Sequence, residues 1–343
     1  MNSIDQIERI TQNRVVNLFR DQLNYDYLGN KEKLPDNRNI EEALLRRFLK
    51  QRQGYSDELI NRAVYEFMRL AGDQVRSFYD INKDVYDLLR YGVKIKTGAG
   101  DKTETVWLIN WEDDWENNDF AFAQEVTVKG PNGKRPDIVL YVNGIALAVL
   151  ELKRATVDVS NGIRQNIDNQ KPEYIQPFFT TIQLVLAGND MQGLSYGTTG
   201  TTERQYDVWK EDSSIANKLD RHLTQLCSKK RLLEIIHDFI IFDHGIKKVC
   251  RSHQYFGVVA AQEHVRSREG GIIWHSQGSG KSLTMVWLAK WIREHVPNSR
   301  VLIVTDRTEL DDQIEKIFLG VEEKIVRTKS GKDLVDKLAD SKP

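Results

Sequence analysis

Cysteine is scarce in this chain, and long apolar runs are missing. Only Cys227 and Cys250 occur among 343 residues. Two cysteines cannot form a disulfide framework, and their scarcity is typical of a reducing compartment, so we expect a cytoplasmic protein. The opening residues lack the apolar core of a secretory signal, and no stretch approaches the ~18 apolar residues of a membrane-spanning helix. The sequence therefore predicts no association with a membrane.

Neither sign of charge is in excess. The 49 Lys and Arg residues stand against 50 Asp and Glu residues, a formal net charge of -1. Any binding of nucleic acid must therefore come from local patches. Basic residues do cluster at 229–231 and again at Lys247, Lys248 and Arg251. Such clusters are more often solvated faces than phosphate contacts, and a true phosphate track would bind less tightly as salt rises.

Internal repeats and Pro-rich or Gly/Ser-rich linkers are also missing, so the domains must be read from periodicity. With 40% hydrophobic residues, a chain of this length is expected to form two or three domains. The pattern predicts helices over about 1–90, a mixed α/β core over about 91–210 and a helical bridge over about 215–245. We assign these three parts to one domain, 1–245, and residues 246–343 to a second.

Two apolar runs joined by Asn143-Gly144 form the strongest β signal and predict a hairpin. Asp137 opens the first run, and Glu151 and Lys153 end the second. Charged groups at the end of such an apolar strand are costly to bury unless something compensates them. A Mg²⁺ ion held by Asp137 and Glu151 would do so and would carry waters, one of which can attack a phosphodiester. Lys153 could orient or deprotonate that water or stabilise the developing charge.

The register of this hairpin decides whether the three side chains meet. A plain two-residue turn would pair Asp137 with Leu150 and point it away from Glu151. A three-residue loop with a left-handed Gly144 pairs Asp137 with Val149 and puts all three side chains on one face, and we predict this loop. The alternative is a surface ion pair beside an ordinary strand start, because Asp…Glu-x-Lys is a permissive pattern.

A glycine-rich loop occupies residues 275–282, with the sequence His-Ser-Gln-Gly-Ser-Gly-Lys-Ser. Apolar segments at 272–274 and 301–305, which we predict to be strands, flank the loop and a helical segment at 282–294. This order predicts a parallel-sheet nucleotide-binding domain. The strict phosphate-loop pattern has Gly where this chain has His275.

The candidate nucleotide-binding residues of the loop are Gly278, Ser279, Gly280, Lys281 and Ser282. The two glycines let backbone amides approach phosphate oxygens at the start of a helix. Lys281 would reach the β- and γ-phosphates of ATP, and Ser282 would ligate Mg²⁺.

Residues 135–153 resemble the nuclease core of type I restriction enzyme motor (R) subunits. They read Arg-Pro-Asp, an apolar strand, Val-Asn-Gly, a second strand and Glu-Leu-Lys. The resemblance implies an α/β fold of the PD-(D/E)xK, restriction endonuclease-like class. It also implies that Asp137 and Glu151 bind Mg²⁺ and that Lys153 is the catalytic lysine.

The same family suggests two further site residues. It often carries a Gln-x-x-x-Tyr motif on the next helix. Gln165 stands at the family's position but is followed by Asn169, whereas Gln170 with Tyr174 fits the letters; we favour Gln165 as the catalytic residue. An acidic residue on the family's first helix corresponds to Glu8, a third candidate metal ligand. A solvated helix-face charge is the alternative for Glu8.

The second half of the chain resembles the same R subunits, which carry a superfamily 2 helicase-like motor. A polar residue precedes Gln-Gly-Ser-Gly-Lys-Ser in that family too. Residues 251–254 resemble the helicase element that reads adenine, with Gln254 as the candidate and a polar helix start as the alternative. Residues 305–313 align with a segment that contacts the DNA backbone, although Asp306 could also end a Walker B strand.

No later acidic motif and no second RecA-like half with an arginine finger follows in this sequence. Because those groups organise ATP hydrolysis, we expect an N-terminal fragment with a complete nuclease and a truncated RecA-like domain that does not hydrolyse ATP.

Together these observations predict the Mg²⁺-dependent endonuclease and ATP-dependent translocase subunit of a type I restriction–modification system. The resemblance implies double-stranded DNA as substrate and methyltransferase and specificity subunits as partners. One rival is a DNA-repair helicase-like ATPase with an inactive nuclease-like docking domain. Another is a non-enzymatic module that tethers a motor to its partner.

Overall fold

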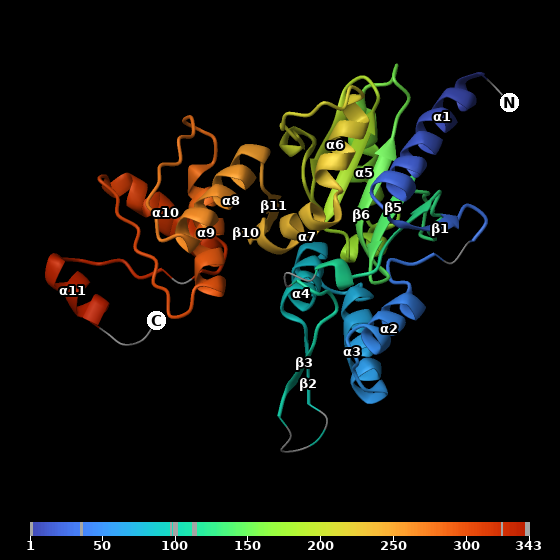
Figure 1. Ribbon diagram of the computed structural model, residues 1–343. Helices are drawn as coiled ribbons and strands as arrows, with labels where there is room; N and C mark the ends of the chain where they lie inside the picture. Colours follow the sequence, from blue (N-terminus) through green and yellow to red (C-terminus); the bar gives the residue numbers. More distant parts are fainter. Residues whose placement is uncertain are drawn as a thin grey trace. The chain divides into compact units, whose positions relative to one another are not determined.

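The computed structural model describes residues 3–34, 37–96, 98, 102–111, 115–323 and 325–339, with the side chains of 3–8 left out. The chain forms two compact units, Met1–His237 and Asp238–Pro343, and each is described by itself (Figure 1). The boundary predicted after residue 245 falls within a hairpin of the second unit, formed by β10 (Ile240–Asp243) and β11 (Ile246–Val249).

A seven-stranded mixed sheet is the centre of the first unit, with the strand order β1-β4-β5-β6-β7-β8-β9. The strands are β1 (Asp26–Asn30), β4 (Phe120–Gln124), β5 (Ile138–Val142), β6 (Ile145–Leu152), β7 (Leu184–Asn189), β8 (Gly193–Gly197) and β9 (Asp207–Val208). The pairs β1–β4 and β6–β7 are parallel, and the remaining neighbours are antiparallel. Every residue of β5 and β6 is buried, as continuous apolar runs predict for strands covered on both faces.

Helices pack against this sheet and at one end of it (Figure 1). The helix α1 (Ser3–Asn17) continues into a π-turn (Leu18–Gln22), and α1 and α5 (Val159–Asn169) both contact β6. Further along the chain, α6 (Lys218–Leu226) packs on β8 and is followed by α7 (Lys229–Asp238). Short 3₁₀ helices occupy Trp115–Asn117, Gln176–Thr180 and Glu203–Gln205.

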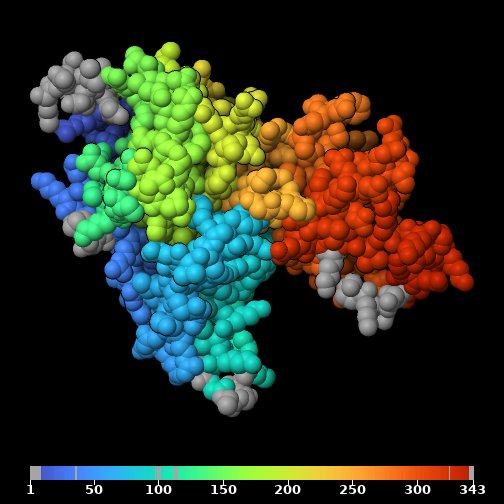
Figure 2. Space-filling view, turned by 180° about the vertical axis from the view of Figure 1, so that it is seen from behind, coloured from blue at the N-terminus to red at the C-terminus, as the bar shows by residue number. Residues whose placement is uncertain are grey.

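A group of three helices lies at the end of the sheet where the β5–β6 hairpin turns. It comprises α2 (Glu42–Gln51), α3 (Asp57–Ala71) and α4 (Phe78–Tyr91), followed by the hairpin of β2 (Val93–Ile95) and β3 (Glu104–Val106). The light-blue to teal surface in the lower part of Figure 2 belongs to these elements. The backbone N–H of Glu41 donates to the carbonyl of Gly144 at 2.7 Å, which fastens the start of α2 to the turn.

The strand β1 lies in the region that the sequence pattern assigned to helices. It is an edge strand that pairs with β4, with Asp26 opposite Ala121. Partners so far apart in the sequence leave no local signal, because the pairing depends on tertiary contact.

The second unit contains the β10–β11 hairpin and helices α8 (Ser252–Arg266), α9 (Lys281–His295), α10 (Thr308–Gly320) and α11 (Gly331–Ala339). The prediction of strands at 272–274 and 301–305 is wrong, since neither segment forms a strand. An extended segment becomes a strand only when a neighbour pairs with its backbone, and none does so among the described residues. Trp274 is accordingly 91% exposed and Val304 82% exposed.

The helices in the described part of the chain are all too short or too polar to cross a membrane.

Candidate active site

The turn of the β5–β6 hairpin differs from the predicted one. Val142 pairs with Ile145, so Asn143 and Gly144 alone make the turn. Both have left-handed backbones, with φ of 53° and 81°, which is the requirement of a two-residue type I′ turn. The prediction of a three-residue loop is therefore wrong.

The extra residue of the hairpin lies inside β6 instead. Leu147 forms a β-bulge, because the residues on either side of it pair with successive residues of β5. A bulge moves the register by one residue. Beyond the bulge, the shifted register places Asp137 opposite Glu151. Lys153, two residues further along the strand, projects on the same face as Glu151.

The two carboxyl groups, one partly and one fully buried, interact with each other. Glu151 is fully buried, and its Oε1 has no hydrogen-bond partner among the described residues. Asp137 Oδ2 accepts a hydrogen bond from the backbone N–H of Leu152 at 2.6 Å. Burial raises the pKa of Asp137 to about 6. Burial, and then the charge of Asp137, raise the pKa of Glu151 well above its usual value.

This pair fits a hard divalent cation such as Mg²⁺. Carboxylate oxygens are its preferred ligands, and the unpartnered Oε1 of Glu151 lacks the partner that a cation would provide. Among residues with described side chains, no cluster of three or more His, Cys, Asp or Glu residues could hold a metal ion. A cation held by two carboxylates would keep several of its waters, which is the usual behaviour of Mg²⁺.

Lys153 and Gln165 complete a chain of contacts with Glu151. The Lys153 Nζ lies 3.7 Å from Glu151 Oε2 and donates to Gln165 Oε1 at 2.7 Å. The Gln165 Nε2 donates to Glu151 Oε2 at 2.8 Å. The structure therefore brings Asp137, Glu151, Lys153 and Gln165 together.

Helix α5 packs close enough to the sheet for Gln165 to reach Glu151, because the residue of α5 that faces the sheet at this point is Gly162. A Cβ at that position would lie 3.1 Å from the Cβ of Ala187 and 3.5 Å from Cγ of Lys153. Any larger residue would push the helix away from β6 and β7.

The alternative glutamine and the acidic residue of the first helix are placed differently. Gln170 accepts from the backbone N–H of Gly200 at 2.8 Å and donates to the carbonyl of Asn166 at 3.0 Å, so its contacts are structural. The ring of Tyr174 lies under Lys134. Glu8 belongs to α1, but its side chain lies outside the described residues.

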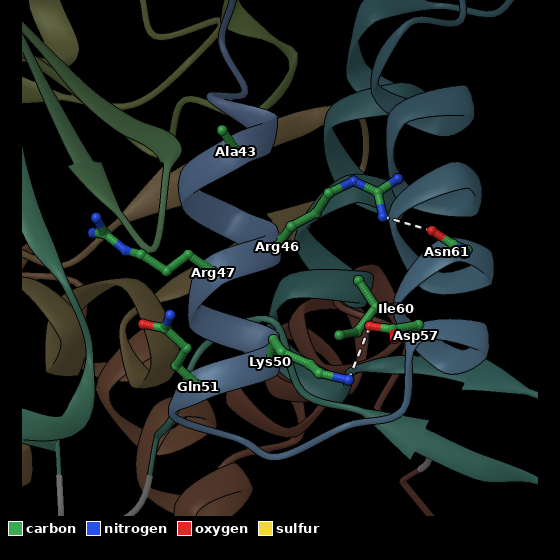
Figure 3. Close-up of a pocket in the computed structure, with 8 residues that line it drawn as sticks. All are labelled: Ala43, Arg46, Arg47, Lys50, Gln51, Asp57, Ile60 and Asn61. Carbon is green, nitrogen blue, oxygen red and sulfur yellow. Dashed lines mark hydrogen bonds and ion pairs between the residues drawn. The ribbon is translucent and has the colours of Figure 1, made fainter.

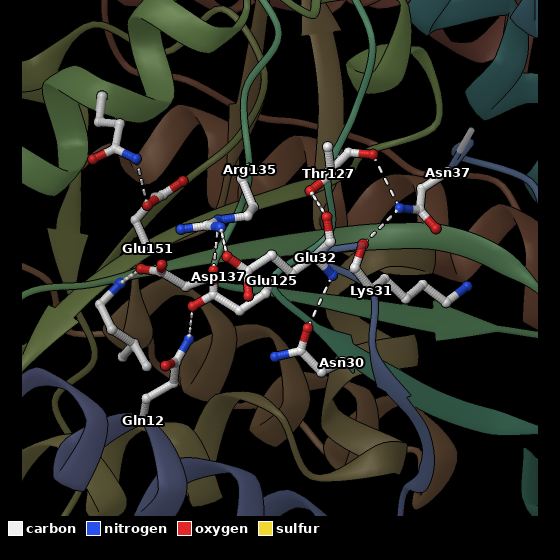
Figure 4. A network of polar contacts seen from close by, with 12 residues as sticks. Gln12, Asn30, Lys31, Glu32, Asn37, Glu125, Thr127, Arg135, Asp137 and Glu151 are labelled. Carbon is white, nitrogen blue, oxygen red and sulfur yellow. Dashed lines mark hydrogen bonds and ion pairs between the residues drawn. The ribbon is translucent and has the colours of Figure 1, made fainter. Parts of the chain in front are cut away.

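Sequence reasoning missed Glu125, which directly follows β4 (Figure 4). Its backbone N–H donates to the carbonyl of Asp137 at 2.8 Å. Its carboxylate accepts from Gln12 Nε2 at 2.6 Å and lies 2.6 Å from Arg135 Nε. The negative charge of Glu125 adds to the rise in pKa of Asp137 and of Glu151. An acid after a strand is too common to be a signal in the sequence alone.

In the second unit, the glycine loop leads directly into α9. Gly278 and Gly280 have φ of 77° and 83°, a backbone that favours glycine. Lys281, the first residue of α9, donates through Nζ to the carbonyls of His275 and Ser276 at 3.2 and 2.9 Å. The amine that is expected to meet phosphates thus contacts the carbonyls of its own loop.

Gln254 braces this loop from α8. It is buried, and its Nε2 donates to the carbonyls of Ser279 and Gly280 at 3.3 and 3.1 Å. Its Oε1 accepts from the backbone N–H of Arg251 at 2.9 Å. A contact of Gln254 with adenine stays a prediction.

Several residues of the basic clusters are ion-paired or buried. Arg231 pairs with Glu211 at 2.8 Å, and Lys230 lies 3.8 Å from Glu234. Lys247 is buried. These contacts agree with solvated or structural roles.

A pocket of about 350 Å³ lies between α2 and α3 (Figure 3). Its lining is Ala43, Arg46, Arg47, Lys50, Gln51, Asp57, Ile60 and Asn61. Arg46 donates to Asn61 at 2.7 Å and Lys50 pairs with Asp57 at 2.9 Å, whereas Arg47 pairs outside the pocket with Asp119 at 3.3 Å. The helix α2 is fastened to the turn of the β5–β6 hairpin, at the opposite end of that hairpin from Asp137.

Comparison with known proteins shows two matches along the chain. Residues 5–204 match the family model described as "Type I restriction enzyme R protein N terminus", and residues 253–343 match the "SWI2/SNF2 ATPase" model.

Several curated relatives are similar to this chain. The type I restriction enzyme HindI endonuclease subunit of Haemophilus influenzae is 31% identical over 74% of the chain and 26% of its own length. The putative type I restriction enzyme MjaIXP endonuclease subunit of Methanocaldococcus jannaschii is 29% identical over 72% of the chain and 27% of its own length. The SsaAORF53P endonuclease subunit of Staphylococcus saprophyticus is 27% identical over 60% of the chain and 22% of its own length. The chain therefore spans about a quarter of the length of these relatives.

Proposed function

The chain belongs to the family defined by the N terminus of type I restriction enzyme R proteins, and on that premise we propose that its first unit is a Mg²⁺-dependent DNA endonuclease. One observation carries the proposal. Two interacting carboxyl groups, the partly buried Asp137 and the fully buried Glu151, lie on one hairpin face beside the amine of Lys153. Such a buried acid pair is unfavourable unless a cation compensates it.

The residues of the site would divide the chemistry among them. Asp137 and Glu151 would hold Mg²⁺, which supplies Lewis acidity and an activated water when bound. Lys153 would orient the attacking water or stabilise negative charge on the phosphate. Gln165 would hold Lys153 and Glu151 at a constant spacing through its two amide ends. Glu8 remains a proposed further ligand from α1.

We propose ATP binding for the second unit, with the loop residues Gly278 to Ser282 around the phosphates and Gln254 near the base. The positive φ of Gly278 and Gly280 and the start of α9 at Lys281 support this role. The match to the SWI2/SNF2 ATPase model supports an ATP-driven DNA translocase in the whole protein.

We also propose that the whole protein acts in the cytoplasm on double-stranded DNA, together with methyltransferase and specificity subunits. The names of the relatives, which are endonuclease subunits of type I restriction enzymes, support this assignment. Cys227 and Cys250 are buried and are not joined by a disulfide bond, which is compatible with a reducing compartment.

Nicking of supercoiled plasmid by the intact chain in Mg²⁺ or Mn²⁺ tests the proposed nuclease. We expect activity that EDTA abolishes and that Asp137→Ala, Glu151→Ala and Lys153→Ala each remove. Arg164→Ala is the matched control, because Arg164 lies on α5 beside Gln165 but pairs with Glu203 at the surface. Equal activity in wild type and Asp137→Ala, or none in either, would contradict the proposal and favour an inactive docking domain.

A further inference from the structure

We propose that Arg135 binds a DNA phosphate at the nuclease site and that Glu125 is the positioning residue that holds it there. This inference rests on the proposed nuclease function. It adds a substrate-binding group that neither the sequence pattern nor the metal site requires.

Arg135 stands at the rim of the buried site. It precedes Asp137 by two residues, and its side chain is 46% exposed. Its Nε lies 2.6 Å from Glu125 Oε2, and its Nη1 donates to Glu32 (Figure 4). The guanidinium is thus held beside the carboxylates while it stays within reach of a solvent-borne ligand.

Glu125 occupies a backbone conformation that is unfavourable for a residue with a side chain. Its φ is 51°, in the left-handed region. Such strain persists only where the surroundings enforce it, and it often marks functional sites. Two segments enforce it here: the segment before β5 accepts its N–H at Asp137 and binds its carboxylate through Arg135, and Gln12 of α1 donates to the same carboxylate.

The charges of the site explain why an arginine would be needed to bind a DNA phosphate there. Asp137, Glu151 and Glu125 are three acids in one region, and Lys153 is engaged with Glu151 and Gln165. A DNA phosphate is itself negative, so the acids repel it wherever they are not neutralised. A guanidinium can present two parallel N–H groups to two phosphate oxygens.

The present ion pairs of Arg135 do not prevent such binding. The Glu32 side chain is 50% exposed, and pairs of this kind contribute little to stability. Arg135 can therefore exchange Glu32 for a phosphate while Glu125, which is mostly buried, keeps its position.

Two assays on the intact chain test the proposal. The first measures the affinity for a short DNA duplex in Ca²⁺, by fluorescence anisotropy. The second measures KM and kcat for plasmid nicking in Mg²⁺. Arg135→Ala should weaken duplex binding and raise KM, with kcat/KM lowered roughly 30-fold or more, as expected for a charge-assisted hydrogen bond. Arg135→Lys should restore part of the loss, and Arg164→Ala should change neither measurement.

A double-mutant comparison separates positioning from a merely structural role. Glu125→Gln keeps the size of the side chain and should raise KM several-fold. If Glu125 acts through Arg135, the double variant should resemble Arg135→Ala alone rather than show the product of the two losses. Multiplicative losses, or unchanged duplex affinity and KM in Arg135→Ala, would overturn the proposal.

The nuclease proposal and the inference about Arg135 would be contradicted by different results. If wild type and Asp137→Ala nick alike, the nuclease proposal fails, and the inference about Arg135 fails with it. If only Asp137→Ala loses activity while Arg135→Ala binds and nicks like wild type, the inference about Arg135 alone is wrong.

Discussion

The amide of Gln165 donates to Glu151 Oε2 across 2.8 Å and so joins helix α5 to strand β6 at the proposed active site. The other end of the same amide accepts from Lys153. One neutral side chain therefore sets the spacing between an acid and an amine.

Removal of this link should lower nuclease activity more than stability. We expect Gln165→Ala to reduce metal-dependent nicking about 10- to 100-fold, the range for loss of a group that orients a metal ligand. Gln170→Ala is the matched control, because Gln170 contacts Gly200 and Asn166 instead. It should lower the melting temperature but keep the nicking rate per folded molecule. If Gln170→Ala lost nicking while Gln165→Ala kept it, the orienting role would belong to Gln170.

The buried acid pair predicts a stability that depends on pH when metal is absent. The pKa of Asp137 is raised to about 6 from 3.8, so the folded chain holds a proton that the unfolded chain releases. The contribution of this group to stability should be greatest below about pH 4 and should be lost as pH rises through about 6, a loss on the order of 3 kcal/mol. Urea unfolding in EDTA at several pH values measures this dependence, and Asp137→Asn should flatten the plot of stability against pH. The same pH dependence in Asp137→Asn as in the wild type would contradict the prediction.

Divalent cations should stabilise the first unit through the same two groups. We expect millimolar Mg²⁺ or Mn²⁺ to raise the melting temperature at pH 8, because the ion binds the folded state only. Asp137→Asn should be more stable than wild type without metal, by on the order of 1 kcal/mol, since it removes a buried like-charge contact. It should also lose the response to metal. A full response in Asp137→Asn would exclude this residue as a ligand.

The hairpin turn should tolerate no side chain at Gly144. A Cβ there would lie 2.7 Å from the carbonyl oxygen of Glu41 and 2.8 Å from Cβ of Leu44, at a φ of 81°. We expect Gly144→Ala to destabilise the chain by about 2–4 kcal/mol, from backbone strain and the clash together. Gly200→Ala is the control, since φ is 74° but nothing lies within 4 Å. Its cost should be about 1 kcal/mol, and equal costs in urea unfolding would show that the clash at Gly144 is relieved.

Nucleotide binding should depend on Lys281 and be independent of the nuclease site. Lys281→Ala should abolish binding of a fluorescent ATP analogue, because the variant lacks the amine that in the wild type would leave the carbonyls of His275 and Ser276 for the phosphates. Asp137→Ala should bind the analogue normally. Unchanged binding by Lys281→Ala would remove the loop from the proposed ATP site.

Local pattern was enough to identify most of the elements that carry the site. The apolar runs around Asn143-Gly144 became β5 and β6, and the helix expected to carry Gln165 became α5. Alternation, turn residues and capping residues act over a few positions, so a single sequence contains them. The strands expected at 272–274 and 301–305 did not form, because a strand needs a partner that its own residues cannot specify.

The sequence by itself determined which residues are available for the proposed chemistry: two acids and a lysine at the ends of a buried hairpin, and a glycine loop before a helix. The tertiary structure decided which of them meet. It placed a bulge at Leu147 rather than a longer turn, chose Gln165 over Gln170, and brought Glu125 and Arg135 to the rim of the site. Register shifts and contacts between distant segments depend on the free energy with which the whole sheet and its helices pack. No short stretch of the chain determines that packing free energy.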